Sequence, residues 1–167
     1  METATATQTE QPKNVVLSDV LRSENDVYRI TLTEFKGERY LDLRIFFRSK
    51  EDAALFIPTS KGVCFPEKLR EEVIAGLIMA RVAPVVERAE GEIFSSVKIC
   101  EIPISETECW RISKGAGAKN TFCDIRKFIA QKDGAFFPSK TKGVSILGTS
   151  LQDVILGLMR TEPEHLA

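Results

Sequence analysis

The chain has 167 residues and a nearly balanced charge, with 23 Lys and Arg residues against 24 Asp and Glu residues. This length is enough for one large domain or two small ones with a buried core. No apolar run reaches the length of a membrane span, and residues 1–11 lack the apolar middle of a signal peptide. We therefore expect an intracellular protein, in the cytoplasm or nucleoid of a bacterium or the nucleus of a eukaryote.

Cysteine and histidine are too sparse and too scattered to form a metal site. The four cysteines have no C-x-x-C spacing, and the single histidine, His165, lies close to the end of the chain. Free thiols in a reducing compartment are therefore expected, with no zinc, no disulfide framework and no cofactor. We interpret residues 1–14 as a disordered tail and residues 162–167 as a second tail.

Basic residues are unevenly distributed along the chain. Residues 111–143 contain eight basic and two acidic residues, a local charge of 8 − 2 = +6, whereas residues 66–92 contain four basic and six acidic ones. The overall charge of −1 argues, by itself, against a nucleic-acid-binding protein. The asymmetry nevertheless indicates one binding face and one solvated or packing face.

Four strands and a helix are predicted in the first half. Alternating residues predict strands at 27–33 and 39–48, joined by a turn in which Gly37 is free to adopt positive φ. Short strands at 54–58 and 62–65 flank a turn between Pro58 and Gly62. Pro66 suits the first position of a helix, which Pro84 should end.

The second half repeats this order. Strand-like residues lie between 92 and 104, where Pro103 indicates a sheet edge, and strands at 110–113 and 120–130 follow. Further strands at 136–138 and 143–147 precede a helix, whose predicted capping box spans residues 149–152 and whose apolar stripe is Leu151, Val154, Ile155 and Leu158. The prediction is an α+β fold of two ββββα units, at 15–90 and 91–161.

The repeat is most specific in one strand of each half. Tyr40, Asp42, Arg44 and Phe46 correspond to Phe122, Asp124, Arg126 and Phe128, with an offset of 124 − 42 = 82 residues. Alternation places each set on one face of its strand, and that face suits base stacking and phosphate contact. In a plainer alternative, each arginine simply pairs with its neighbouring aspartate. Phe47 has the parity of core residues and would need a bulge to face outward.

These motifs, together with Phe35-Lys36-Gly37 and the Lys-Gly-Val steps at 61–63 and 142–144, resemble the positive-cofactor-four family of transcriptional coactivators, which bind single-stranded DNA. The resemblance implies a curved four-stranded antiparallel sheet followed by a helix, with two fused units paired through their helices as an internal pseudo-dimer. Plant Whirly proteins have a similar duplicated layout. Glu38, in a position that is usually basic, and Ile129, in place of a stacking aromatic residue, depart from the family pattern.

The resemblance and the strand pattern together predict a nucleic-acid-binding surface. Its predicted residues are Lys36, Arg39, Arg44, Phe46, Phe47, Lys61, Lys119, Arg126, Phe128, Lys140 and Lys142. We expect a protein without catalytic activity that binds single-stranded DNA or RNA in transcription, replication or repair. Further expected partners are the transcription or replication machinery and a second copy of the fused pair, but no membrane.

Two alternatives stay open. A duplicated protein-interaction scaffold would fit the nearly neutral charge. A nucleotide-binding enzyme would use the Gly-rich loop at 114–121, but that loop fails the spacing of a phosphate-binding motif and precedes a strand, not a helix.

Overall fold

The computed structural model describes residues 11–161. Its elements, in chain order, are β1 (Lys13–Leu21), β2 (Asp26–Phe35), β3 (Glu38–Arg48), β4 (Phe56–Pro66), the 3-10 turn η1 (Glu67–Leu69), α1 (Arg70–Val82), β5 (Ser95–Pro103), β6 (Glu108–Ala116), β7 (Thr121–Ala130), β8 (Phe136–Leu147) and α2 (Leu151–Leu158). The strands form one antiparallel sheet in the order β1-β2-β3-β4-β8-β7-β6-β5. The predicted α+β class is therefore confirmed.

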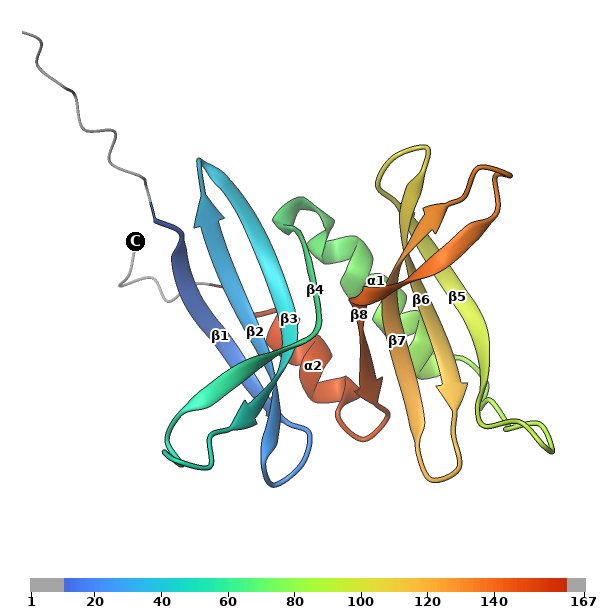
Figure 1. Cartoon of the computed structure of the whole chain (residues 1–167), viewed down its shortest axis with the longest axis horizontal. Helices are drawn as coiled ribbons and strands as arrows, with labels where there is room; N and C mark the ends of the chain where they lie inside the picture. Colours follow the sequence, from blue (N-terminus) through green and yellow to red (C-terminus); the bar gives the residue numbers. More distant parts are fainter. Residues whose placement is uncertain (1–10, 162–167) are drawn as a thin grey trace, which may run out of the picture.

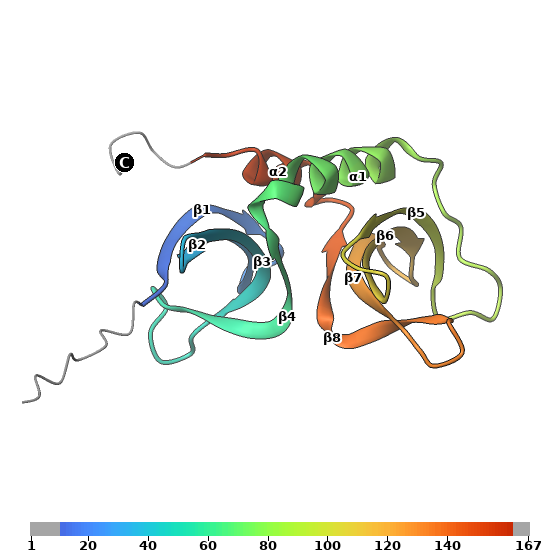
Figure 2. The same cartoon turned by 90° about the horizontal axis from the view of Figure 1, so that it is seen from above.

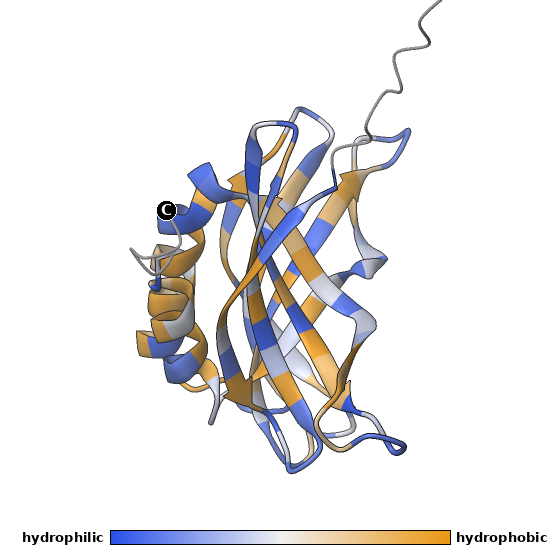
Figure 3. Ribbon diagram, turned by 90° about the vertical axis from the view of Figure 1, so that its left-hand side faces the viewer, coloured by the Kyte–Doolittle hydropathy of each residue, from blue (hydrophilic) through white to orange (hydrophobic). Residues whose placement is uncertain are grey.

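Each group of four strands curls strongly, and the two helices lie side by side outside both curls (Figures 1 and 2). Apolar and polar residues alternate along the strands (Figure 3), so one side of each strand turns to the core. On β2 and β3, for example, Ile30, Leu41 and Leu43 are fully buried. A single core cluster joins these strands to both helices and to the strands of the second half.

The strand predictions need two corrections. β1 was not predicted from the sequence, and it begins at Lys13, within the segment interpreted as a tail. The predicted strands at 54–58 and 62–65 are one bent strand, β4, and those at 136–138 and 143–147 are likewise one strand, β8. The Pro and Gly signals therefore mark a bend within a strand instead of a turn between two strands.

The register locates these bends. Arg44 pairs with Gly62 and Phe46 pairs with Pro58, so three residues of β4 lie opposite one residue of β3. In the second half, the pairs Arg126–Gly143 and Phe128–Pro138 leave four residues of β8 opposite one residue of β7. The extra residues bulge out of the ladder, as expected where one strand carries more residues than its neighbour. We call residues 59–61 and 139–142 the two bends.

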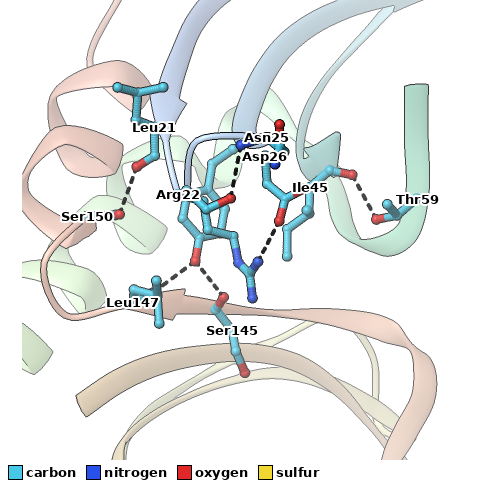
Figure 4. A network of polar contacts seen from close by, with 11 residues as sticks. Leu21, Arg22, Asn25, Asp26, Ile45, Thr59, Ser145, Leu147 and Ser150 are labelled. Carbon is cyan, nitrogen blue, oxygen red and sulfur yellow. Dashed lines mark hydrogen bonds and ion pairs between the residues drawn. The ribbon is translucent and has the colours of Figure 1, made fainter. Parts of the chain in front are cut away.

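The helices follow most of the sequence signals. α1 ends at Val82, just before Pro84, and the predicted stripe of α2 is buried. The predicted capping box is wrong, because no side chain caps α2. The hydroxyl of Ser150 instead donates to the carbonyl of Leu21 at 3.0 Å, which ties α2 to β1 (Figure 4). No helix within residues 11–161 is long and apolar enough to cross a membrane.

The two halves meet at the edges of β4 and β8, where Gly62 pairs with Gly143. Tyr28 of β2 extends this junction: its hydroxyl donates to the Ser145 carbonyl at 3.0 Å and accepts from the Leu147 N–H at 2.9 Å. Burial raises the pKa of this phenol, so it stays protonated and able to donate. Beyond Gly143, where β8 no longer pairs with β4, a side chain from the other half thus bonds its backbone.

All four cysteines are free thiols, and Cys123 is the most deeply desolvated of those with a raised pKa. His165 lies outside the described residues. Burial raises the pKa of Cys123 to about 12. Since an unfolded thiol ionises near pH 8.5, the unfolded chain loses this proton first, and the stabilisation present below that pH is lost as the pH rises toward 12.

The wild type should therefore lose about 1–2 kcal/mol more unfolding free energy than Cys123→Ala between about pH 8 and pH 10. Urea denaturation at both pH values measures this difference. The other three cysteines are present in both the wild type and Cys123→Ala, so their contribution to the pH dependence of the unfolding free energy cancels in the comparison. Parallel pH profiles would show that Cys123 does not remain protonated in the folded state.

Candidate functional site

The strand face predicted from the repeat exists in both halves. On β3, Leu41, Leu43 and Ile45 are buried, while the four residues between and beside them are partly exposed. On β7, Cys123 and Ile125 are buried and the matching four residues are partly exposed. The helices cover the other side of each curl (Figure 2), so the predicted face lies away from the helices. The prediction that the four residues of each set lie on one face of their strand is confirmed.

Both arginines of this face are held by the protein itself. Arg44 donates to the Asp42 carboxylate at 3.1 and 3.0 Å and to the Thr59 carbonyl at 3.0 Å. Arg126 repeats this pattern with Asp124, at 3.2 Å for both bonds, and with the Ser139 carbonyl at 3.0 Å. The plainer alternative of intramolecular pairing is therefore the observed one. The guanidinium groups hold the two bends.

We call the hydrogen bonds that hold Arg44 and Arg126 over the two bends the arginine clamp. The glycine that follows each bend leaves the space that this clamp needs. A Cβ placed on Gly62 would lie 2.7 Å from Cζ and 2.9 Å from Cγ of Arg44. A Cβ on Gly143 would lie 2.5 Å from Cζ of Arg126. These separations are shorter than non-bonded carbon atoms allow. The Asp-x-Arg and Lys-Gly parts of the sequence motif are thus one packing unit.

The clamped bends expose lysines to solvent. Lys61 lies on the first bend, and Lys140 and Lys142 lie on the second; all three are exposed. Hydroxyls support both bends: Thr59 donates to the Ile45 carbonyl at 2.7 Å (Figure 4), and its oxygen accepts from the N–H of Lys61 at 3.2 Å. The Ser139 hydroxyl accepts from the N–H groups of residues 141 and 142 in the same way.

A cationic hollow of about 290 Å³ lies where the bends of the two halves meet. Its basic lining residues are Arg22, Lys61, Arg126 and Lys140, and no Asp or Glu of the described chain is among its lining residues. Arg22 is also paired with Asp26 at 2.9 Å. The two lysines are consequently the cations most open to an anionic ligand. Sequence reasoning missed Arg22, which has no counterpart in the repeated motif.

Arginines cover one side of the strand-face rings. Cζ of Arg29 lies 4.8 Å from the ring centre of Phe46, and Cζ of Arg111 lies 3.8 Å from that of Phe128. Both distances are within the range of cation–π attraction. Carboxylates orient the two arginines, Asp19 for Arg29 at 2.8 Å and Glu101 for Arg111 at 2.7 Å.

Sequence reasoning missed these covering arginines and their carboxylates. Both recur at the repeat offset: Arg29 and Arg111 are 111 − 29 = 82 residues apart, and Asp19 and Glu101 are 101 − 19 = 82 residues apart. A search of the repeat beyond the central strand would have found them. Phe46 and Phe128 can therefore stack with a ligand only on the ring face that the arginine leaves open.

Phe47 is 40% exposed, so it does not occupy the core position that its parity on the strand indicates. No bulge in the pairing with β2 turns it outward, because the register of β2 and β3 is continuous through this residue. The core on this strand ends at Ile45, and Phe47 lies beyond it. Ile129, at the matching position of β7, is 36% exposed.

The turn residues lie apart from the bends. Lys36 and Gly37 have φ values of 51° and 76°, which form the tight turn between β2 and β3. This turn and the β6–β7 turn, which carries the exposed Lys119, lie at opposite ends of the molecule (Figure 1). Arg39 is paired with Glu67 at 2.9 Å.

The Gly-rich loop considered for an enzyme joins β6 to β7 and does not open a helix. Lys114, at its start, donates to the Ala83 carbonyl at 2.7 Å. The loop therefore lacks the helix N-terminus that a phosphate-binding loop uses. It is a hairpin connection between two antiparallel strands.

Residues 23–75 match the family model described as Transcriptional Coactivator p15 (PC4). This segment belongs to the PC4 family. The PC4 segment spans all of β2, β3, β4 and η1 and the start of α1. Among solved structures, a PC4 homolog from Burkholderia pseudomallei is 28% identical, covering 42% of this chain and 93% of that chain with a TM-score of 0.39. A comparison with curated proteins finds no match.

The PC4 segment contains the predicted site residues of the first half, from Lys36 to Lys61. Those of the second half, from Lys119 to Lys142, lie outside it and are related to it through the internal repeat. The structure brings Lys61, Lys140 and Arg126 together at one hollow, whereas it leaves Lys36 and Lys119 on separate turns.

Proposed function

We propose that this protein binds single-stranded nucleic acid, with DNA as the main ligand, and does not catalyse a reaction. We propose that it acts in transcription, replication or repair. The observation that carries the proposal is the cationic hollow, at which exposed lysines from both halves meet. The PC4 segment supports it, because the family's description is that of a transcriptional coactivator. We propose further that the two fused halves act as an internal pair.

The contacts indicate different roles for the arginines, the lysines and the aromatic rings of the motif. Arg44 and Arg126 are bonded to carboxylates and carbonyls, so their main role is to shape the bends. The lysines on those bends then neutralise phosphates, and the partly exposed rings offer stacking surfaces. A single strand suits this surface better than a duplex, because its bases are free to reach the rings while its backbone follows the bends. Little sequence preference is expected from such contacts.

Fluorescence anisotropy with a labelled oligonucleotide, single-stranded or annealed to its complement, tests this function. We expect tighter binding of the single strand, with the logarithm of the association constant falling by about 0.7 per neutralised phosphate for each tenfold rise in salt. Absence of binding to either form at low salt would contradict the proposal and favour the protein-interaction scaffold. Binding of ATP in calorimetry would instead support the enzyme alternative.

A further inference from the structure

A second hollow, of about 510 Å³, lies on the strand face of the second half. Three aromatic rings line it, those of Phe94, Phe122 and Phe128, together with Pro138. Asp124 and Ser113 are among its polar lining residues. Most of its lining is apolar, so this hollow differs in character from the cationic hollow.

Two features specific to the second half build this hollow. Phe94, from the segment before β5, meets Phe122 edge to face, with ring centres 6.3 Å apart and planes at 67°. Gly115 of β6 makes room for Phe122, since a Cβ there would lie 2.5 Å from Cζ of that ring. At the matching positions 94 − 82 = 12 and 115 − 82 = 33, the first half has Pro12 and Thr33.

The polar lining is fixed in place. The Ser145 hydroxyl donates to Asp124 at 2.7 Å, and Arg126 donates to both oxygens of the same carboxylate. Arg126 and Ser145 line the cationic hollow as well as the aromatic one, so the two hollows are neighbours. A site for flat rings therefore adjoins a site for anions, which is the arrangement that a nucleotide requires.

We propose that the aromatic hollow seats one base of a bound single strand while an adjacent phosphate lies on Lys61 and Lys140 of the cationic hollow. This inference rests on the proposed function and makes the two halves unequal. In the first half, Arg29 lies 4.8 Å from the Phe46 ring centre and 5.7 Å from that of Phe56. In the second half Arg111 likewise covers Phe128, at 3.8 Å, but Phe94 adds a ring beside Phe122, and the three rings leave an open hollow.

Substitutions around the rim test the base seat. Phe94 is 58% exposed, so Phe94→Ser should leave the fold intact and weaken oligonucleotide binding by about fivefold or more, the loss of one stacked base. Ser96→Trp should fill the hollow and weaken binding similarly. The matched control is Ile93→Ser, because Ile93 is 83% exposed on the same segment but does not line the hollow. It should bind like the wild type.

A direct reporter is the added tryptophan of the Phe94→Trp variant. Trp110, the only native tryptophan, is 3% exposed and gives a constant background. A single-stranded oligonucleotide should quench the added emission, and an abasic deoxyribose-phosphate chain of the same length should not. A deoxynucleoside monophosphate should bind far more weakly, because it lacks the further backbone contacts.

The outcomes separate this inference from the function on which it rests. A wild type that binds no oligonucleotide removes the proposed function itself. If the wild type binds the oligonucleotide, Phe94→Ser and Ser96→Trp bind it with unchanged affinity, and Phe94→Trp shows no quenching, then the aromatic hollow does not hold a base. The proposed function would stand in that case. Monophosphate binding as tight as that of the oligonucleotide would also overturn the proposal, because the ligand would then be a free nucleotide.

Discussion

Replacing Lys61, Lys140 and Lys142 with glutamine should lower the affinity for single-stranded DNA by about 100-fold at about 0.1 M salt. The three side chains are exposed on the bends, and none forms an ion pair within residues 11–161. If each neutralises one phosphate, the salt dependence should lose about 0.7 per lysine, or roughly 2 in total. Anisotropy titrations of both proteins across a series of salt concentrations measure the two effects.

The matched control removes three other exposed lysines, Lys13, Lys50 and Lys132, and so makes the same change in net charge. We expect it to retain most of the affinity and of the salt dependence. Equal losses in both triple variants would mean that the overall charge attracts the strand, with no special role for the bends.

The substitution Gly62→Ala should lower the free energy of unfolding by about 2–3 kcal/mol. The new Cβ would lie 2.9 Å from Cγ of Arg44, an atom of the side-chain stem that cannot move aside without the guanidinium. Displacing it would break the bonds to Asp42 and to the Thr59 carbonyl. It would also disturb the pair with Gly143 that joins the two halves. Chemical denaturation measures the change.

Gly117→Ala is the control, because a Cβ there would meet only the Asn120 carbonyl oxygen, at an ordinary 3.8 Å. Its effect should stay within about 0.5 kcal/mol. Should Gly62→Ala prove equally harmless, the clamp of Arg44 over the bend would be incorrect. The bend would then need another explanation.

Local patterns in the sequence were sufficient to predict the two helices and to assign the residues of each central strand to its two faces. Strand alternation has a period of two whichever elements cover it, so Leu41 and Leu43 could be assigned to the core and Asp42 and Arg44 to the other face. Pro84 excludes a continuing helix through its own ring and missing N–H group, which is again a local effect. The repeat offset similarly predicted two equivalent groups of elements.

The contacts that decide the site depend on residues far apart in the chain. Thr59 reaches Arg44 only because β4 carries extra residues at its bend, and the alternation of β3 contains no sign of this. The same holds for Arg29 over Phe46 and for the approach of Phe94 to Phe122. Such pairings are set by strand register and sheet curvature, because a guanidinium can bond to whichever carbonyl, carboxylate or ring the folded sheet brings within reach.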